Sequence, residues 1–256
     1  MHVKVLGAHQ LETRDTRLTS LLVDGVLAID AGSLTSTLTM AEQEAIRAVL
    51  ITHHHFDHTR DLLTLGINTD SSTTEVYSTA EVLESLSANL VNGTIYPRVT
   101  DSYSSLPPSL RFNRLDPGEP ARVQGYTVLP VPVPHGPPTV GYQVTDAQGK
   151  AIFYTGDTGP GCSSAWPHIR PDLLLIEVTL PNRLDESAGK TGHLTPRLLA
   201  EELRRFQTTK GYLPKVLGLH INPVHEEEIR SELEEVAKCL EANVALAHEG
   251  LEIELR

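Results

Sequence analysis

Short apolar runs separated by turn residues predict three strands at the start of the chain, at residues 2–7, 20–23 and 26–31. Asp24-Gly25 lies between the last two, and this dipeptide is typical of a tight turn joining antiparallel strands. Residues 41–48 are expected to form a helix, and the apolar residues 49–52 predict a buried strand that leads into a histidine-rich segment. A further helix is expected near residues 79–92, followed by a loop rich in Pro, Ser and Tyr.

In the rest of the chain the predicted strands alternate with helices. Thr195-Pro196 predicts a helix to about residue 208, because threonine caps helix N-termini and proline fits the first helical position. Asn222-Pro223 predicts another in the same way, through about residue 241. Predicted hairpins come first in the chain, and strands that alternate with helices follow. This order favours an α/β fold with two sheets packed face to face and helices outside. The expected strands are residues 126–132, 139–145, 151–155, 173–178 and 216–220, with a closing hairpin or strand pair at 245–247 and 251–255.

Size and composition are those of a globular protein. The 256 residues, 39% of them hydrophobic, suffice for one large domain or two small ones. Met1 is followed by polar residues rather than a signal peptide's apolar segment, and no apolar run approaches the roughly 20 residues of a membrane span. We therefore expect a cytoplasmic protein without a membrane partner. Cys162 and Cys239 are too few for a disulfide framework and are expected to be reduced thiols.

Acidic residues outnumber basic ones by 33 to 21, which gives a net charge of −12. A protein that binds large nucleic acids is expected to carry a basic patch, because phosphate neutralisation supplies much of its affinity. The charge balance therefore argues against a large nucleic acid as partner. It favours a small-molecule substrate that meets its charge partners inside a cleft.

A dense group of possible metal ligands follows the predicted strand at residues 49–52, in the sequence HHHFDH. In an extended chain alternate side chains point the same way, so His53 and His55 can face one metal, while His54 faces away. Asp57 and His58 follow where the chain turns and can reach a second position. Imidazole and carboxylate groups suit zinc, with manganese or iron as alternatives. The pattern predicts a metal site rather than a polar loop that happens to be rich in histidine.

Three later residues share one placement with this group, at the C-terminal end of a predicted strand. His135 stands beside a glycine, Asp157 lies in a loop flanked by glycines, and His220 lies between a strand and a helix. Taken alone, each of these placements is equally typical of an ordinary loop residue. Because sites in open α/β folds are built at that end of the strands, we expect the three side chains to join the histidine cluster.

The pattern H-x-H-x-D-H followed by His135, Asp157 and His220 resembles the metal ligands of the metallo-β-lactamase superfamily. That resemblance implies a single domain over residues 1–256 with a four-layer αββα sandwich, and two divalent metal ions at one edge of the sheets. It assigns His53, His55 and His135 to the first metal. It assigns Asp57, His58 and His220 to the second, with Asp157 as the bridge.

Several further segments resemble the class II cyclic-nucleotide phosphodiesterases of that superfamily. They include the segment LIEVTLPN at residues 175–182 and the segment GHLTP at residues 192–196, of which many superfamily members lack the second. One departure is Phe56, because that family usually has leucine before the aspartate of the motif. The resemblance implies hydrolysis of cyclic AMP or cyclic GMP to the 5′-monophosphate by a bridging hydroxide, and it allows a homodimer.

His193 and Glu177 are the expected proton-transfer residues, and Asp57 is counted with them as a catalytic carboxylate as well as a metal ligand. His193 precedes a helix cap near the ligand edge, and Glu177 could hydrogen-bond its ring and keep it protonated. A similar pairing in the related tRNA 3′-processing enzymes supports this interpretation. The alternatives are a solvent-facing loop histidine and a carboxylate in an ordinary salt bridge.

Other hypotheses remain open. The same fold could cleave another phosphodiester, a lactone or a thioester, or the chain could be a metal-containing binding protein without turnover. Arg98 could meet a phosphate or be a solvated surface residue, and Asp30 is expected to be a structural turn carboxylate. The segment that could line a substrate cleft also includes Tyr96 and Tyr103, and the histidines without a supporting pattern are His2, His9, His168, His225 and His248.

Overall fold

The computed structural model describes residues 1–69, 72–102 and 107–256. Within them the strands form two seven-stranded sheets, in the orders β14-β1-β2-β3-β4-β5-β6 and β13-β12-β11-β10-β9-β8-β7. The first contains β1 (His2–Gly7), β2 (Ser20–Val23), β3 (Leu27–Ile29), β4 (Ala48–Leu50), β5 (Thr74–Ser78), β6 (Leu110–Arg114) and β14 (Glu252–Glu254). The second contains β7 (Ala121–Val123), β8 (Tyr126–Pro132), β9 (Val140–Thr145), β10 (Ala151–Tyr154), β11 (Leu173–Glu177), β12 (Lys215–Leu219) and β13 (Val244–Leu246).

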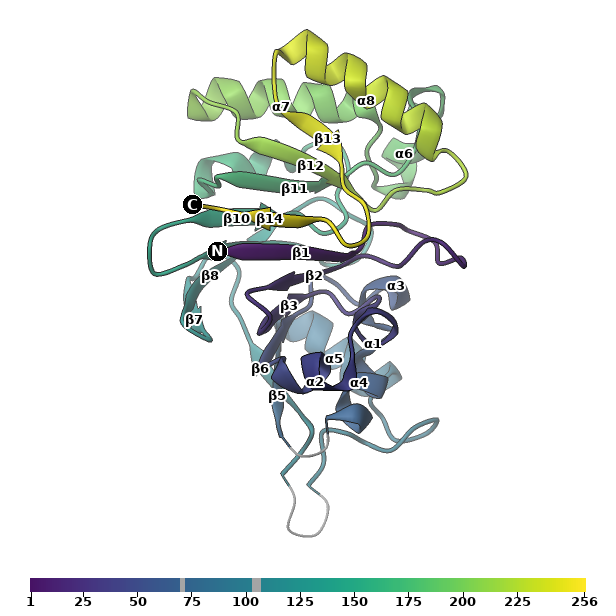
Figure 1. The fold of residues 1–256 in the computed structure, drawn as a ribbon, viewed down its shortest axis with the longest axis vertical. Coiled ribbons are helices and arrows are strands. Elements are labelled where there is room, and N and C mark those ends of the chain that lie inside the picture. Colours follow the sequence, from purple (N-terminus) through teal and green to yellow (C-terminus); the bar gives the residue numbers. More distant parts are fainter. Residues whose placement is uncertain (70–71, 103–106) are drawn as a thin grey trace.

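Helices cover the outer faces of both sheets, so the predicted αββα sandwich is confirmed (Figure 1). Beside the first sheet lie α1 (Leu34–Thr37), α2 (Met40–Ala45), α3 (Phe56–Thr59), α4 (Leu62–Asn68) and α5 (Ala80–Asn89). Beside the second lie α6 (Asp185–Thr191), α7 (Pro196–Lys210) and α8 (Glu226–Leu240), with 3₁₀ turns at Cys162–His168 and Asn182–Leu184. Among the described residues, none of these helices combines the length and apolar character needed to cross a bilayer.

The alternation of side chains along each strand divides the interior into two hydrophobic clusters. Leu21 and Ile29 of the first sheet belong to one cluster with Tyr142 of the second, whose hydroxyl donates to the Ile51 carbonyl across the space between the sheets. Leu22, next to Leu21 and pointing the other way, packs in the cluster beneath the first sheet's helices. Strand side chains alternate with a period of two, so a single apolar strand supplies both clusters.

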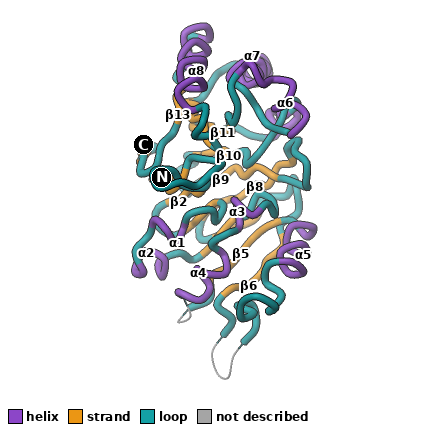
Figure 2. Tube along the Cα trace, turned by 90° about the vertical axis from the view of Figure 1, so that its right-hand side faces the viewer, coloured by secondary structure: helices purple, strands orange, loops and turns teal. Residues whose placement is uncertain are grey.

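Parallel pairing brings several strand ends to one edge. β3, β4 and β5 run parallel in the first sheet, and β10, β11 and β12 run parallel in the second. Figure 2 looks at the molecule from this edge, with α3 near the centre of the view. The loops that follow β4, β8, β10 and β12, which contain the predicted metal ligands, therefore meet there.

Three predictions of local structure were wrong. The helix expected at residues 41–48 ends at Ala45, and β4 begins at Ala48. Asn222 does not cap α8: its side chain accepts a hydrogen bond from the Val224 amide in a turn, and the helix begins at Glu226. The expected closing hairpin does not form either, because β13 pairs with β12 while β14 crosses to the other sheet and pairs with β1. Sequence pattern alone does not show which sheet a short strand joins.

Candidate metal centre

The seven predicted ligands converge in two groups. Within each group one ligand atom per residue lies within 4.8 Å of the others, and the two groups share Asp157. The first group comprises His53, His55, His135 and Asp157, and the second comprises Asp57, His58, Asp157 and His220. The structure therefore brings together side chains that span some 170 positions of the sequence, in the division that the resemblance implies.

In the first group, hydrogen bonds fix the direction of two imidazole rings. The Thr52 hydroxyl donates to the Asp30 carboxylate at 3.0 Å, so it accepts from His53 Nδ1–H, also at 3.0 Å. His135 Nδ1–H donates to the carbonyl of Gly192 at 2.9 Å. In both rings the proton is therefore on Nδ1, and Nε2 carries a free lone pair. The Nε2 atom of His135 lies 3.3 Å from Nδ1 of His55.

The second group is ordered in the same way. His58 Nδ1–H donates to Asp30 at 2.7 Å, and its Nε2 atom lies 3.1 Å from Oδ1 of Asp157. His220 Nδ1–H donates to the Thr179 hydroxyl at 2.9 Å, because that hydroxyl gives its own proton to Glu177 at 2.7 Å. The Nε2 atom of His220 then faces Asp57 at 3.2 Å and Asp157 at 3.4 Å.

The donor set fits divalent cations. Among the described residues, Nε2 of His53, Nε2 of His58 and Oδ1 of Asp157 are buried without a hydrogen-bond partner. Lone pairs that face one another in a buried space repel, and buried polar atoms without partners are costly, unless a cation lies between them. Burial lowers the pKa of His53 well below its usual value and keeps the ring neutral, the form that binds metal. Burial opposes ionisation of Asp157, but His220 and His58 outweigh it and lower the pKa of this carboxyl.

Glu177 and His193 form a pair beside this centre. His193 Nδ1–H donates to Glu177 at 2.8 Å, and the carboxylate also accepts from the amides of Thr158 and Leu194. Burial opposes a charged imidazole, but Glu177 outweighs it and raises the pKa of His193 to about 9. The His193 ring lies 5.2 Å, between centroids, from the ring of His135, so it borders the first group.

Two backbone positions at the site have unusual conformations. His220 has a φ of 58°, which is uncommon for a residue other than glycine and is held here by its hydrogen bonds. Gly156 has a φ of 63°, and a Cβ atom there would lie 2.8 Å from the Cβ atom of Thr52. The loop before Asp157 therefore packs directly against the residue that orients His53.

Sequence reasoning missed three residues that organise the site. Thr52 and Thr179 were given no role, and Asp30, expected to be a structural turn carboxylate, hydrogen-bonds His58 directly and receives the Thr52 hydroxyl. Their sequence signal is weak, because threonine and aspartate near strand ends are common. Their contribution depends on which side chain the neighbouring strand places opposite them.

Other candidate residues lie outside the two groups. His54 belongs to neither, as the alternation predicts. Arg98 lies near Asp101 on the surface with half of its side chain exposed, and Tyr96 is exposed as well. His225 contacts Arg183 through Nδ1. Tyr103 lies outside the described residues.

Comparison with known proteins places this geometry in a family. A family model described as "Beta-lactamase superfamily domain" matches residues 19–221. A probable 3′,5′-cyclic-nucleotide phosphodiesterase of Yersinia pestis is 27% identical over 210 residues, which cover 72% of this chain and 60% of the relative. A ribonuclease Z of Gemmatimonas aurantiaca is 32% identical over 108 residues, which cover 42% of this chain and 32% of that enzyme. The chain thus spans less than two thirds of the length of either curated relative.

Solved structures agree on the fold. Unliganded yeast PDE1 superposes with a TM-score of 0.83 at 17% identity, covering 99% of both chains. The metallo-β-lactamase fold protein YhfI of Bacillus subtilis superposes with a TM-score of 0.77 at 18% identity, again covering 99% of both chains. The family model covers well over half of the sequence, and the site has the geometry described above. The chain therefore belongs to the β-lactamase superfamily domain family, with the metallo-β-lactamase fold.

Proposed function

We propose that this metal-dependent hydrolase is a phosphodiesterase that converts 3′,5′-cyclic nucleotides to 5′-nucleoside monophosphates. The observation that carries the proposal is the Glu177–His193 pair beside the two ligand groups. A phosphodiester needs a proton for its departing alkoxide, and a protonated imidazole held at the site can supply one. The likeness to the Yersinia pestis protein supports a cyclic-nucleotide substrate.

The residues would divide the work as follows. His53, His55 and His135 would hold one divalent ion, and Asp57, His58 and His220 the other, with Asp157 shared. Zinc suits these ligands, and manganese or iron are alternatives. When bound, such ions lower the pKa of a water ligand and neutralise charge on phosphoryl oxygens.

Proton transfer would fall to the chain's own side chains. Because His193 keeps its Nδ1 proton on Glu177, its Nε2 atom is the site from which a proton can pass to the departing ribose oxygen. Glu177 stabilises the imidazolium before transfer and holds the ring in place throughout. Four hydrogen bonds fix this carboxylate, from His193, Thr179 and two backbone amides.

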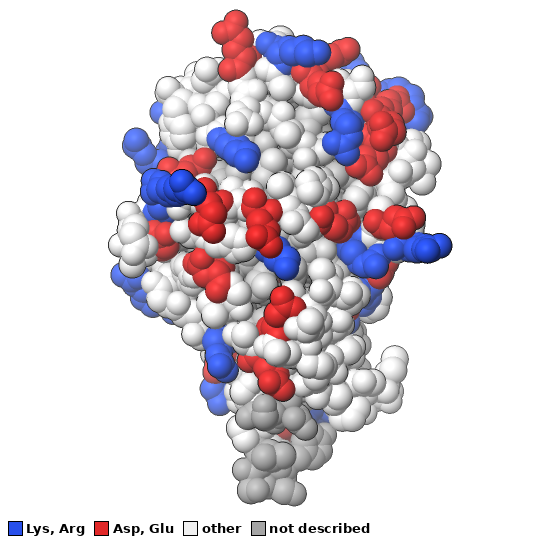
Figure 3. Space-filling view, in the orientation of Figure 1, with Lys and Arg blue, Asp and Glu red and all other residues white. Residues whose placement is uncertain are grey.

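A tRNA-processing nuclease is the second candidate, and the ribonuclease Z likeness favours it. The charge distribution supports the small substrate instead. The chain has a net charge of −12, and on the face in Figure 3 the described Lys and Arg side chains are interspersed with Asp and Glu. Neutralising many phosphates would need basic side chains gathered along one surface.

The test is a substrate panel. The purified, metal-loaded protein is incubated with cyclic AMP, cyclic GMP, a lactone, a thioester and a precursor tRNA, and product formation is followed by chromatography. We expect 5′-monophosphates from the cyclic nucleotides and little turnover of the others. Turnover of the lactone, the thioester or the tRNA with inert cyclic nucleotides would refute the proposal.

A further inference from the structure

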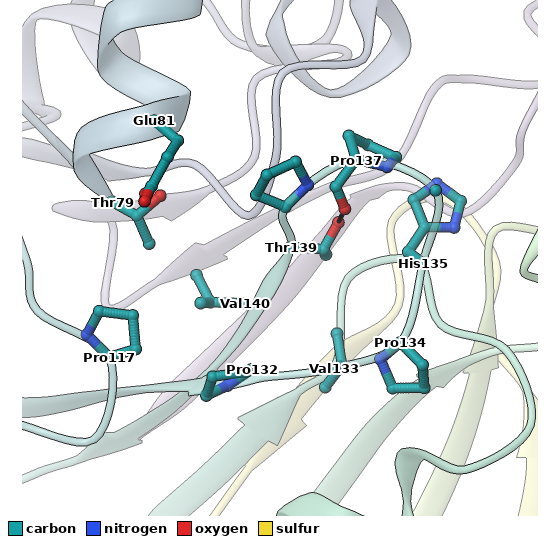
Figure 4. A pocket seen from close by; sticks show the side chains of 12 residues that line it. Thr79, Glu81, Pro117, Pro132, Val133, Pro134, His135, Pro137, Thr139 and Val140 are labelled. Atoms are coloured by element: carbon teal, nitrogen blue, oxygen red, sulfur yellow. Dashed lines mark hydrogen bonds between the residues drawn. The ribbon is translucent and has the colours of Figure 1, made fainter.

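A cavity of about 430 Å³ lies next to the candidate metal centre. His135, a member of the first ligand group, forms part of its wall, so the cavity adjoins the place where a phosphate would be held. Its volume is within the usual range for small-molecule sites. Figure 4 shows the cavity between the segment after β8 and the start of α5.

Most of the cavity wall is apolar and rigid. Pro132, Val133 and Pro134 lie along one side, as Figure 4 shows, and further prolines from the segment after His135 close another. Proline rings have few internal degrees of freedom and present flat apolar surfaces, so they lose little entropy when a planar group packs against them. A flat heteroaromatic ring fits such a wall.

Two polar side chains of the wall lie at the start of α5, whereas the Thr139 hydroxyl elsewhere in the wall donates to the Pro137 carbonyl. Thr79 occupies the N-cap position but makes no side-chain capping hydrogen bond, and its Oγ1 atom is buried without a partner among the described residues. Thr79 is 4% exposed, so water does not compensate freely for the missing bond. Glu81, in the first turn of the same helix, is exposed and lines the same cavity. Thr79 and Glu81 therefore contribute a hydroxyl and a carboxylate to the same wall.

We propose that this cavity is the subsite for the base of the nucleotide, and that Glu81 with Thr79 selects guanine over adenine; the inference rests on the proposed cyclic-nucleotide activity. A carboxylate is only an acceptor, whereas a hydroxyl both donates and accepts. Guanine offers two adjacent N–H donors, N1–H and the 2-amino group, which a carboxylate accepts in pairs. Its O6 atom can accept from the Thr79 hydroxyl.

Adenine fits the same groups poorly. The N1 atom of adenine is an acceptor beside the 6-amino donor, so a carboxylate that accepts from the amino group places its other oxygen against a lone pair. Sites built to hydrogen-bond one partner reject an analogue with mismatched donors, because polar groups are then left unpaired. The cavity therefore predicts a preference for cyclic GMP.

The decisive variant is Glu81→Gln, with Glu84→Gln as the matched control. The carboxamide offers one donor and one acceptor, which suits adenine, whereas Glu84 is an exposed residue of the same helix that does not line the cavity. We expect the wild type to favour cyclic GMP over cyclic AMP in kcat/KM by about tenfold, and Glu81→Gln to abolish that ratio while Glu84→Gln keeps it. Hydrolysis of bis(4-nitrophenyl) phosphate, which has no purine, is the internal standard.

A binding measurement separates this inference from the proposed function. Calorimetry gives the Kd of the metal-loaded protein for 5′-GMP and 5′-AMP, whether or not cyclic nucleotides are hydrolysed. Tighter binding of 5′-GMP that is lost in Glu81→Gln and weakened about fivefold in Thr79→Val supports the subsite even if turnover fails. Because the Thr79 side chain makes no capping hydrogen bond, we expect Thr79→Val to keep the fold. Equal affinities for the two nucleotides in the wild type overturn the proposal. So does the same ratio of the two Kd values in Glu81→Gln and Glu84→Gln.

Discussion

Two buried carboxylates, one beside each sheet, orient the side chains of the site through the same pattern of hydrogen bonds. The two patterns serve different roles. Asp30 accepts directly from His58 and, through the Thr52 hydroxyl, orients His53. Glu177 accepts directly from His193 and, through the Thr179 hydroxyl, orients His220. In both cases one ring is held by the carboxylate itself and a second by a threonine between them.

The difference lies in what the directly held ring can reach. His58 is fully buried and points its Nε2 atom at Asp157, so Asp30 orders only members of the two candidate ligand groups. The side chain of His193 keeps 12% of its surface exposed and belongs to neither group of the seven ligands. In our proposal the same arrangement therefore serves cation binding on one side and proton delivery on the other.

The largest effect is expected from Asp30→Asn. The amide tolerates the left-handed backbone at this position, where φ is 58°, but it sets a donor against His58 or Thr52. Breaking this buried pair should lower the free energy of unfolding by about 3 kcal/mol and weaken metal binding by about 100-fold. Urea unfolding and elemental analysis measure the two effects, with the exposed Asp116→Asn as control. Wild-type metal content and wild-type stability in Asp30→Asn would refute the proposed role of Asp30 in ordering the site.

His193→Ala should act on turnover alone. We expect the rate with cyclic nucleotides to fall by about 100-fold while both metal ions stay bound, because the variant loses the proposed proton donor and none of the seven residues assigned to the two ions. His168→Ala, at an exposed histidine, is the control and should keep its rate. An unchanged rate in fully metallated His193→Ala would remove this residue from the mechanism.

The two threonines allow a finer test. Thr52→Val and Thr179→Val each delete one hydroxyl that holds a ring, and residues that orient metal ligands typically change affinity by tenfold or more. We expect Thr52→Val to lower the affinity for one ion and Thr179→Val to lower the affinity for the other, each by about tenfold. Chelator competition resolves the two affinities. Loss of the same ion in both variants would show that the two threonine hydroxyls do not act on separate positions.

The smallest effect is expected at a third carboxylate–imidazole cluster, whose members belong to neither ligand group. Burial opposes charging of His9, but its hydrogen bonds with Glu249 and Glu226 outweigh burial and raise its pKa above 6.5. A raised folded pKa stabilises the protein fully below 6.5, and this contribution is lost as pH rises through the folded value. The free energy of unfolding should therefore decline from pH 6.5 upward in the wild type and decline less in His9→Gln. The free energy of unfolding is measured by urea titration at several pH values. An equal decline with pH in the wild type and in His9→Gln would refute this prediction.

Sequence predicted the sandwich and the convergence of the ligands because both follow from local pattern. Apolar runs of strand length define the sheets, and His135, Asp157 and His220 each follow such a run directly. Thr195 was also correctly predicted to cap α7, and its hydroxyl accepts from the Leu198 amide. The helix cap and the position of each ligand directly after its strand depend on residues within one turn or one strand of each other.

What sequence could not predict depends on register between distant segments. Thr179 matters because β11 and β12 pair so that Glu177 lies beside Leu219, just before His220. The role of Asp30 likewise rests on the hydrogen bonds that it makes across the first sheet to Thr52. A threonine or an aspartate in the sequence does not indicate which distant residue it will hydrogen-bond. The roles of Thr179 and Asp30 can therefore be seen only when the pairing of the strands is known.

Gly156 touches neither substrate nor ion in our proposal, yet its missing side chain leaves room for Thr52. A single added methyl group would push against the residue that aims His53 and would also strain a backbone at φ 63°. A random library screened for inactive clones should therefore return this glycine as readily as a ligand. Intolerance to substitution at a catalytic edge can thus report lack of space rather than chemistry.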